Sequence, residues 1–384
     1  MTPATLADLQ TPALILDRSK VQRNISRMAE RAAALGVALR PHLKTPKCVH
    51  IAALLQRAGA TGFNVSTLKE AEFFHAAGID DLYYCVPFAP NKAQRAAALV
   101  RDGCRLTLMT DSLDGARAAV AAAEALAGDT VLTFTLEIDV DGYRSGMALD
   151  GPDLVLAARL LQKSRATRFA GIMSYAGASY GKTPAQTADL TETHRRALAR
   201  ARATLLESGL DCERVSFGST PAVLHARELT GITEARCGIY MFQDLFQAGI
   251  GACERDDIAL SVLASVTSRQ PRHNRLVIDA GGLALSKDRS TAGRDFDAGY
   301  GLVCDAASGA PLGDLAVTAV SQELGLVTSL SGAPLDFGRF PVGALVRILP
   351  NHADMTAAAY EHYAVVDGGA EVETVWARTN HWAD

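Results

Sequence analysis

Three residues that could do chemistry, Lys44, Arg144 and Tyr175, stand at or just after the ends of short apolar runs. If each run is a strand that leads into a helix, the strand ends meet at one mouth of a βα barrel. Such barrels place their catalytic groups at that mouth. Lys44 by itself could equally be one solvated cation among 38 lysines and arginines. Its agreement in position with the other two residues favours catalysis.

The turn Gly218-Ser219-Thr220-Pro221 has the composition of a helix start. Ser219 or Thr220 can cap the helix, Pro221 suits its first turn, and Gly218 allows close approach of the backbone. The unpaired N–H groups at a helix start bind anions, and barrels often hold phosphate in the loops after strands 7 and 8. Taken alone, the turn is better explained as a plain helix cap without a ligand, but together with Gly238 in the next loop it favours phosphate binding.

The segment Leu349-Pro350-Asn351-His352-Ala353-Asp354 carries a candidate metal pair. In a strand or extended turn, residues two apart face the same side, so His352 and Asp354 could reach one ion. Two protein ligands would leave positions for water and substrate, as in a catalytic site. One imidazole and one carboxylate do not select among Zn²⁺, Mn²⁺ and similar ions. The alternative is a turn with a solvated carboxylate.

The candidate residues must be positioned by strands and helices. Along the chain, short apolar runs alternate with helical patterns rich in Ala, Leu, Glu and Arg, such as 67–77, 112–127, 152–163 and 184–208. Eight runs alternating with helices predict a (β/α)8 barrel, an α/β fold of the TIM type. The eight runs are residues 37–40, 62–66, 81–86, 105–110, 131–138, 169–175, 214–217 and 234–238.

After residue 250 the pattern changes to strands joined by Gly, Asp and Ser turns. We expect a barrel domain over residues 20–250, and a mostly β domain formed by residues 251–384 together with 1–19. That second domain would carry the metal pair. The expected strands are 12–17, 258–268, 276–279, 316–322, 345–349 and 364–366.

Composition restricts the partners. The 384 residues are 48% hydrophobic and 21% charged, with a net charge of −4, which argues against nucleic acid or an anionic membrane as partner. No apolar run approaches a membrane span, and residues 1–8 show no secretory signal. Seven scattered cysteines without a Cys-x-x-Cys pair suit a reduced, cytoplasmic chain.

Together these motifs resemble the pyridoxal-phosphate (PLP) enzymes of the alanine-racemase fold type. They are most similar to the metal-dependent D-serine dehydratase and D-threonine aldolase family, and within it to bacterial D-threo-3-hydroxyaspartate dehydratases. The resemblance covers nearly the whole chain. The matching motifs are Arg40-Pro41-His42-x-Lys44-Thr45, Ser66-Thr67-x-x-Glu70-Ala71, Glu137-Ile138-Asp139-x-Asp141-Gly142-x-Arg144-Ser145-Gly146, Gly218-Ser219-Thr220-Pro221, Asp279-Ala280-Gly281, Gly299-Tyr300-Gly301-Leu302-Val303-Cys304-Asp305 and Pro350-Asn351-His352-Ala353.

The resemblance implies a role for each candidate residue. Lys44 would hold PLP as a Schiff base and act as base at Cα, with Tyr175 as a second catalytic candidate near the cofactor. Arg144 would face the pyridine nitrogen, and His352 and Asp354 would bind Zn, Mn or Mg. The implied phosphate-binding residues are Gly218, Ser219, Thr220, Gly238 and Tyr240. Relatives of this fold type imply a homodimer.

The implied reaction is elimination of water from a 3-hydroxy D-amino acid, giving a 2-oxo acid and ammonia. Retro-aldol cleavage to glycine and an aldehyde is the alternative. Asp354 stands where the dehydratases usually have Cys and the aldolases Asp, and the chain reads Glu323-Leu324-Gly325 where the family often has Glu-His-Gly. A non-catalytic PLP carrier would resemble the barrel alone, and a racemase would leave the metal pair without a role.

Overall fold

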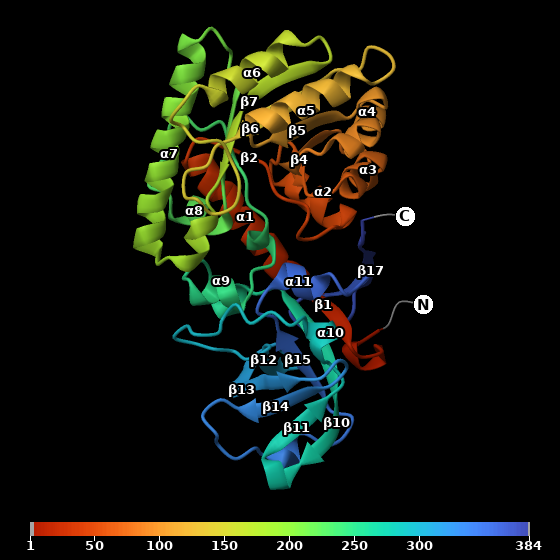
Figure 1. Ribbon diagram of the computed structural model, residues 1–384. Coiled ribbons are helices and arrows are strands. Elements are labelled where there is room, and N and C mark those ends of the chain that lie inside the picture. The colour runs from red at the N-terminus through yellow and green to blue at the C-terminus, as the bar shows by residue number, and fades with distance from the viewer. Residues whose placement is uncertain (1–3, 383–384) are drawn as a thin grey trace. The chain divides into compact units, whose positions relative to one another are not determined.

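The computed structural model describes residues 4–382, which divide into two compact units (Figure 1). The barrel unit comprises residues 26–238 with the residues from His381 on. The β unit comprises residues 239–380 with the N-terminal segment up to Ile25. Of residues 1–8, in which no secretory signal is expected, residues 1–3 lie outside the described part of the chain.

Eight parallel strands form the barrel, in the order β2-β9-β8-β7-β6-β5-β4-β3. Its two ends meet through the bridge between His42, just after β2, and Asn64 of β3. The predicted (β/α)8 barrel is therefore confirmed. The strands are β2 (Ala38–Leu39), β3 (Phe63–Val65), β4 (Asp81–Pro87), β5 (Arg105–Thr110), β6 (Leu132–Glu137), β7 (Thr167–Tyr175), β8 (Arg214–Gly218) and β9 (Glu234–Ala235).

Helices cover the outside of this sheet, and several begin at caps that the sequence supplies. Thr67 accepts the N–H of Glu70 at the start of α3, and Thr183 forms a capping box with Gln186 at α7. Such caps satisfy N–H groups that a helix start leaves without partners. The helices are α1 (Arg18–Ala34), α2 (Val49–Arg57), α3 (Leu68–Ala76), α4 (Ala93–Arg101), α5 (Leu113–Glu124), α6 (Asp153–Lys163), α7 (Pro184–Glu207) and α8 (Thr220–His225).

The β unit is built on a nine-stranded sheet in the order β11-β14-β13-β12-β15-β10-β1-β16-β17. Only β1 and β16 pair in parallel. The strands are β1 (Ala13–Asp17), β10 (Leu260–Gln270), β11 (Arg275–Ile278), β12 (Leu302–Asp305), β13 (Pro311–Val320), β14 (Gly325–Ser329), β15 (Leu345–Leu349), β16 (His362–Val366) and β17 (Thr374–Ala377). Three short helices accompany them, α9 (Leu245–Gly249), α10 (Gly282–Leu285) and α11 (Ala353–Ala357).

Three of these strands, β12, β14 and β17, were not expected from the sequence. β17 has no buried residue, and β14 alternates between buried and half-buried positions, so neither forms a continuous apolar run. β12 is four residues long and follows the glycines 299 and 301. Within residues 4–382, no helix has the length and apolarity that crossing a membrane requires.

Candidate active site

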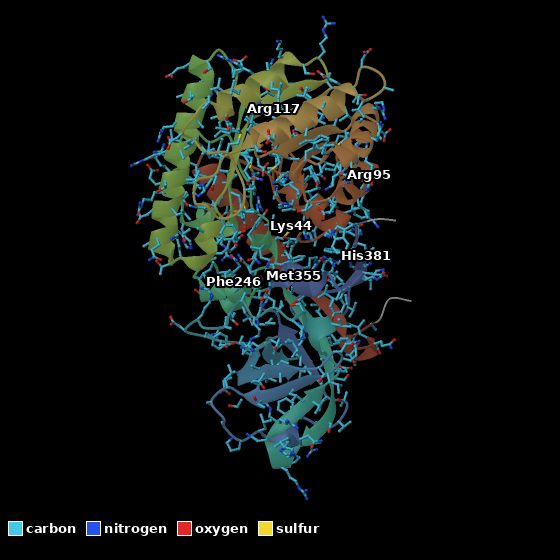
Figure 2. All side chains as sticks on the ribbon, viewed as in Figure 1. Lys44, Arg95, Arg117, Phe246, Met355 and His381 are labelled. Atoms are coloured by element: carbon cyan, nitrogen blue, oxygen red, sulfur yellow. The ribbon has the colours of Figure 1, made fainter. Side chains whose placement is uncertain are left out.

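Backbone hydrogen bonds fix the loop that carries Lys44. The N–H of His42 donates to the carbonyl of Cys237 at 2.8 Å, and the N–H of Leu43 donates to the carbonyl of Asn64 at 2.8 Å. Asn64 in turn donates its own N–H to Pro41 at 2.8 Å. The side chain of Lys44 (Figure 2) is exposed at the carboxyl end of β2. The barrel thus holds the backbone before Lys44 from two sides and leaves its side chain accessible.

The imidazole of His42 lies beside this loop. Its Nδ1 accepts the backbone N–H of Lys44 at 3.3 Å, and its Nε2 lies 3.3 Å from the hydroxyl of Ser66. Burial holds the pKa of His42 well below its usual value, and the nearby cations Lys44 and Arg236 act in the same direction. His42 is therefore neutral at neutral pH and orders the backbone of Lys44.

The Gly218 turn forms the helix start that its sequence predicts. Ser219 caps α8 by accepting the N–H of Ala222 at 3.2 Å, and its hydroxyl lies 2.8 Å from that of Ser179. Thr220 is fully buried, and its hydroxyl has no hydrogen-bond partner in the described part of the chain. A buried hydroxyl without a hydrogen-bond partner is destabilising, and a bound oxyanion would supply the missing partner.

Glycine contacts place three loops at the same mouth of the barrel. A Cβ on Gly238 would lie 3.0 Å from both the Cβ of His42 and the hydroxyl of Thr45. A Cβ on Gly218, whose φ is +147°, would lie 2.4 Å from the carbonyl oxygen of Arg236. The loops after β2, β8 and β9 therefore pack closely, and a cradle of glycines and hydroxyls lies near the lysine loop.

Arg144 is held by a buried carboxylate. Its guanidinium donates to Oε1 of Glu137 at 3.0 Å, while the hydroxyl of Ser145 donates to Oε2 at 2.6 Å. The side chain of Glu137 is only 2% exposed. The guanidinium also lies 4.6 Å from the ring centroid of Tyr175, which pairs with Gly218 in the sheet. Burial raises the pKa of Tyr175, and Tyr143 adds to the shift, so its phenol stays protonated.

Arg236 is a buried cation that was not predicted from the sequence. It donates to Sγ of Cys85 at 3.2 Å and to the carbonyl of Ser174 at 3.4 Å, and its guanidinium lies 5.6 Å from the ring centroid of Tyr83. A signal for it existed, because an arginine two residues before Gly238 interrupts an otherwise apolar predicted strand.

The barrel unit thus brings together most of the predicted cofactor site. Tyr240 belongs to the β unit, where it is buried in the 3-10 turn η4 (Ile239–Met241). The metal pair also belongs to the β unit. The predicted residues that share the barrel mouth are Lys44, Arg144, Tyr175, Gly218, Ser219, Thr220 and Gly238.

The metal pair lies where β15 ends and α11 begins. His352 has extended backbone angles and directly precedes the helix, whereas Asp354 is its second residue. The expected strand or extended turn is therefore wrong for Asp354, because the chain enters a helix between the two residues. Asn351 fixes the segment by donating to the carbonyls of Gly299 at 2.7 Å and Asp288 at 2.9 Å.

Asp244 lies in the same corner of the β unit, and no motif in the sequence indicated it. It is fully buried, and its Oδ2 accepts the N–H of Ala353 at 3.0 Å while its Oδ1 accepts that of Gln247 at 2.8 Å. Burial raises the pKa of Asp244 to about 7, although His352 and the backbone N–H groups of Gln247 and Ala353 act in the opposite direction.

The donor chemistry of His352 and Asp354 suits a divalent ion with open positions. Within residues 4–382, no three His, Cys, Asp or Glu side chains are grouped closely enough to hold a metal by themselves. One imidazole and one carboxylate would leave the remaining positions to water and substrate oxygen atoms, as catalytic metal chemistry requires.

Two family models match the chain. Residues 16–245 match the alanine racemase N-terminal domain, and residues 259–366 match the putative serine dehydratase domain. The chain is 43% identical to D-threo-3-hydroxyaspartate dehydratase of Delftia sp. (strain HT23), over 98% of this chain and 99% of that protein. It is 32% identical to D-serine dehydratase of Dictyostelium discoideum over 98% of each chain.

A D-threonine aldolase of Arthrobacter sp is also similar, with 30% identity over 97% of this chain and 92% of that protein. Among solved structures, a metal-free form of D-threo-3-hydroxyaspartate dehydratase, in which a cysteine is replaced by alanine, superposes with a TM-score of 0.94. Its sequence identity is 42%, and the match covers 99% of this chain and 100% of that chain. The resemblance drawn from the motifs is therefore confirmed.

Proposed function

Because this chain belongs to the family of alanine-racemase-like D-serine dehydratases and D-threonine aldolases, we propose that it is a lyase that uses PLP and a divalent metal. It eliminates water from a 3-hydroxy D-amino acid to give a 2-oxo acid and ammonia. D-threo-3-hydroxyaspartate and D-serine are the candidate substrates. The observation that carries the proposal is the grouping of Lys44, Arg144 and the glycine and hydroxyl cradle at one barrel mouth.

The chemistry divides between the cofactor, the metal and the chain. When bound, PLP supplies an electron sink for negative charge at Cα, and the metal supplies a Lewis acid for the β-hydroxyl. Lys44 carries the cofactor and accepts the Cα proton at its Nζ. The fixed backbone before Lys44 and the neutral ring of His42 hold the lysine in place for both tasks.

The phosphate is assigned to the cradle beside the lysine loop. Thr220 contributes a buried hydroxyl without a partner, and Gly218 and Gly238 allow the backbone to approach an anion closely. Ser219 and Tyr240 complete the assignment, with Ser219 also capping α8.

Arg144 donates a hydrogen bond to the pyridine nitrogen in this proposal. An arginine does not release its proton, so the ring nitrogen stays unprotonated and the sink is weak. A weak sink makes departure of the β-hydroxyl dependent on the metal. Glu137 keeps the guanidinium in position, and Tyr175 packs against it as a neutral phenol. A protonated Tyr175 is a poor base, which argues against racemisation.

His352 and Asp354 are the proposed metal ligands, with Zn²⁺, Mn²⁺ and Mg²⁺ as candidates. Asn351 and Asp244 order the backbone that carries these two side chains, Asn351 through its bond to Gly299 and Asp244 by accepting the N–H of Ala353. Their task is to hold the ion that binds the β-hydroxyl oxygen of the substrate.

One residue favours a second candidate function. Asp354 is the aldolase-type ligand in a chain whose other motifs resemble dehydratases. A carboxylate is a harder ligand than a thiolate, and a metal held by Asp354 would supply the acidity at the β-hydroxyl that cleavage of the Cα–Cβ bond requires. Retro-aldol cleavage to glycine and an aldehyde is therefore the alternative.

One assay separates the two reactions. Purified protein loaded with PLP is incubated with D-threo-3-hydroxyaspartate, D-serine or D-threonine, in the presence of Mn²⁺ or Zn²⁺. We expect a 2-oxo acid and ammonia in equal amounts, with activity lost in EDTA and restored by metal. If glycine and an aldehyde are the main products, the protein is an aldolase rather than a dehydratase. Turnover that persists undiminished in chelator would remove the metal from the proposal.

Two further expectations accompany this function. All seven cysteines are free in the structure. The cytoplasmic location stays a prediction. The homodimer stays a prediction, and light scattering of the loaded protein measures it directly.

A further inference from the structure

Glu70 places a buried carboxylate beside the lysine loop, residues 40–47. It is the third residue of α3, and in the usual capping box a glutamate at this position binds the backbone N–H of the N-cap, here Thr67. Instead, Oε2 of Glu70 accepts the N–H of Ser66 at 2.7 Å, and Oε1 lies 3.3 Å from Nζ of Lys47. The side chain of Glu70 is only 2% exposed. Its two oxygens therefore serve two segments, the end of β3 and the lysine loop.

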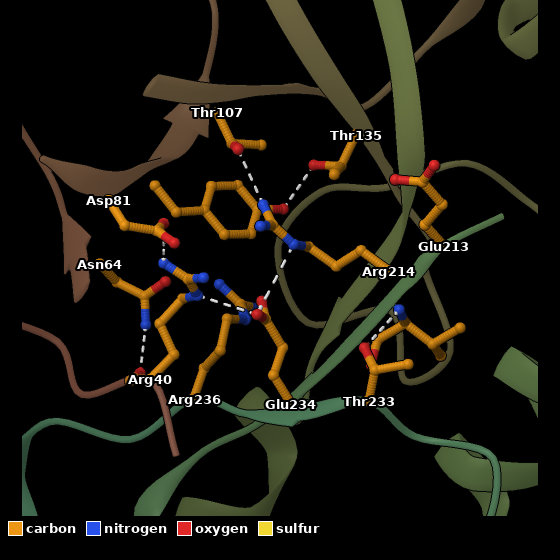
Figure 3. A network of polar contacts seen from close by, with 12 residues as sticks. Arg40, Asn64, Asp81, Thr107, Thr135, Glu213, Arg214, Thr233, Glu234 and Arg236 are labelled. Atoms are coloured by element: carbon orange, nitrogen blue, oxygen red, sulfur yellow. Dashed lines mark hydrogen bonds and ion pairs between the residues drawn. The ribbon is translucent and has the colours of Figure 1, made fainter. Parts of the chain in front are cut away.

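The amino-terminal end of the lysine loop is fixed by a network of polar contacts (Figure 3). Arg40 donates to Glu234 at 2.8 Å and to Asp81 at 2.6 Å, and its side chain is only 5% exposed. The carbonyl of Arg40 accepts the side-chain amide of Asn64. Lys44 lies four residues beyond this anchor, so its place also depends on contacts further along the loop.

Lys47 closes the turn that displays Lys44. Its N–H donates to the carbonyl of Leu43 at 2.8 Å, so Lys44 lies inside the turn. The φ of Lys47 is +46°, a left-handed conformation that is uncommon for a residue of this type. Such a conformation raises the free energy of the chain and persists only where the surroundings hold it. The ion pair with Glu70 is a contact that holds Lys47 in this conformation.

The other oxygen of Glu70 acts on the residues before Lys44. It accepts the N–H of Ser66, and the hydroxyl of Ser66 lies 3.3 Å from Nε2 of His42. Because Nδ1 of the neutral His42 ring accepts the N–H of Lys44, the ring proton is on Nε2 and is donated to Ser66. One carboxylate therefore supports the lysine loop on both sides of Lys44.

From these contacts we infer that Glu70 is a positioning residue for Lys44 and that it acts through its ion pair with Lys47. The inference rests on the function proposed for Lys44. A lysine that carries the cofactor and also accepts the Cα proton must be placed accurately, since an error of about 1 Å can lower a rate about a hundredfold. Both oxygens of Glu70 are occupied and its side chain is buried, so it acts on the reaction only through the loop.

The test compares Glu70→Gln, Lys47→Met and the double variant in the full-length, PLP-loaded protein. Each single variant leaves one charge of the pair without its partner, so the thermal stability should fall. The double variant removes both charges and keeps an oxygen that can accept the N–H of Ser66, so its thermal stability should return close to that of the parent. Glu72→Gln, at a half-exposed residue of α3 that pairs with Arg95, is the matched control.

Two measurements on the double variant separate positioning from stability. We expect kcat to stay at least about tenfold below that of the parent, with KM near the parent value, although the stability has recovered. We also expect PLP to leave the loaded protein faster, which the loss of its visible band after dilution measures without any substrate. Glu72→Gln should match the parent in stability, kcat and PLP release.

Recovery of kcat and of PLP retention together with stability in the double variant would overturn the inference, because Glu70 and Lys47 would then only stabilise the fold. Equal losses in Glu70→Gln and Glu72→Gln would overturn it as well. A parent protein without the visible band would contradict the proposed function, and the inference would fall with it. A parent that shows the band, with variants that behave as the parent does, would overturn the inference alone.

Discussion

The carboxylate of Asp244 accepts the backbone N–H of Ala353, the residue that separates His352 from Asp354. The same carboxylate caps α9 through Gln247, so one buried group ties the proposed metal ligands to a second helix. Side chains that orient metal ligands typically contribute ten- to a hundredfold to metal affinity.

We therefore expect Asp244→Asn to weaken metal binding by about tenfold or more, because the amide must turn an N–H₂ group toward one of the two backbone N–H groups. Competition with a fluorescent chelator measures the affinity directly. PLP content, read from absorbance, is expected to stay at the parent level. If the metal affinity does not change, Asp244 acts only as a helix cap.

Lys44→Ala is expected to abolish the visible absorbance band of a lysine–PLP Schiff base, along with turnover. The matched control is Lys163→Ala, at an exposed lysine that ends α6. Borohydride should bleach the band in the parent and in the control, and peptide mapping should then locate the label on Lys44. A band that survives in Lys44→Ala contradicts the assignment.

Glu137 and Arg144 are expected to act as a unit. Glu137→Gln removes a charge-assisted hydrogen bond worth about 1.5–3 kcal/mol, so turnover should fall about tenfold or more as the guanidinium loses its fixed position. Arg144→Lys should have a similar cost, since lysine cannot reproduce the guanidinium fork. Steady-state kinetics of the double variant show whether the two residues act as a unit. If they do, the double variant loses no more turnover than either single variant, whereas independent roles would make the two losses multiply.

The free energy of unfolding should decrease as the pH is lowered, because a buried histidine resists taking up a proton in the folded protein. Burial lowers the pKa of His194 below its ordinary 6.5, while Asp141 acts the other way. Between the lowered and the ordinary value, the unfolded chain binds more protons than the folded one, so the free energy of unfolding decreases as pH falls below about 6.5.

Urea unfolding at several pH values measures this slope, and His194→Gln is expected to flatten it. Part of the slope should remain, since His42 shifts in the same direction. His50→Gln, at an exposed residue of α2, serves as the control and should keep the parent slope. A His194→Gln slope as steep as the parent's would assign the effect to other groups.

Asp354→Cys tests which residue selects the reaction. A thiolate is a softer ligand than a carboxylate and favours Zn²⁺ over Mn²⁺ or Mg²⁺. We expect the variant to prefer Zn²⁺ and to form more 2-oxo acid relative to glycine than the parent. A product ratio that does not move would show that substrate orientation, rather than this ligand, decides which bond breaks.

The sequence predicted elements best where packing leaves a continuous apolar run. The predicted bounds of β5 (Arg105–Thr110) and β15 (Leu345–Leu349) match the structure, because nearly every residue of both strands is buried. The strand expected over 234–238 is shorter in the structure, where β9 ends at Ala235. Exposed strands such as β17 lack the apolar signal altogether.

The candidate site was predictable only where local composition carries the chemistry. Ser219 and Pro221 mark a helix start within four residues, and the structure shows that start. Asp244 and Arg236 matter through contacts with residues far away in the sequence, Ala353 and Cys85. No spacing rule connects such partners, so only the folded chain reveals them.

The backbone hydrogen bond from His42 to Cys237 also has a consequence for folding during synthesis. The lysine loop can form its hydrogen bonds with Asn64 early, but it gains the one from His42 to Cys237 only when the segment that follows β9 is in place. A nascent chain leaves the ribosome from its N-terminus and forms contacts distant in sequence late. Lys44 is therefore among the first residues of the barrel to be synthesised, while the support of its loop is completed only when the last part of the barrel follows. An incomplete barrel would not hold the lysine loop in its active conformation.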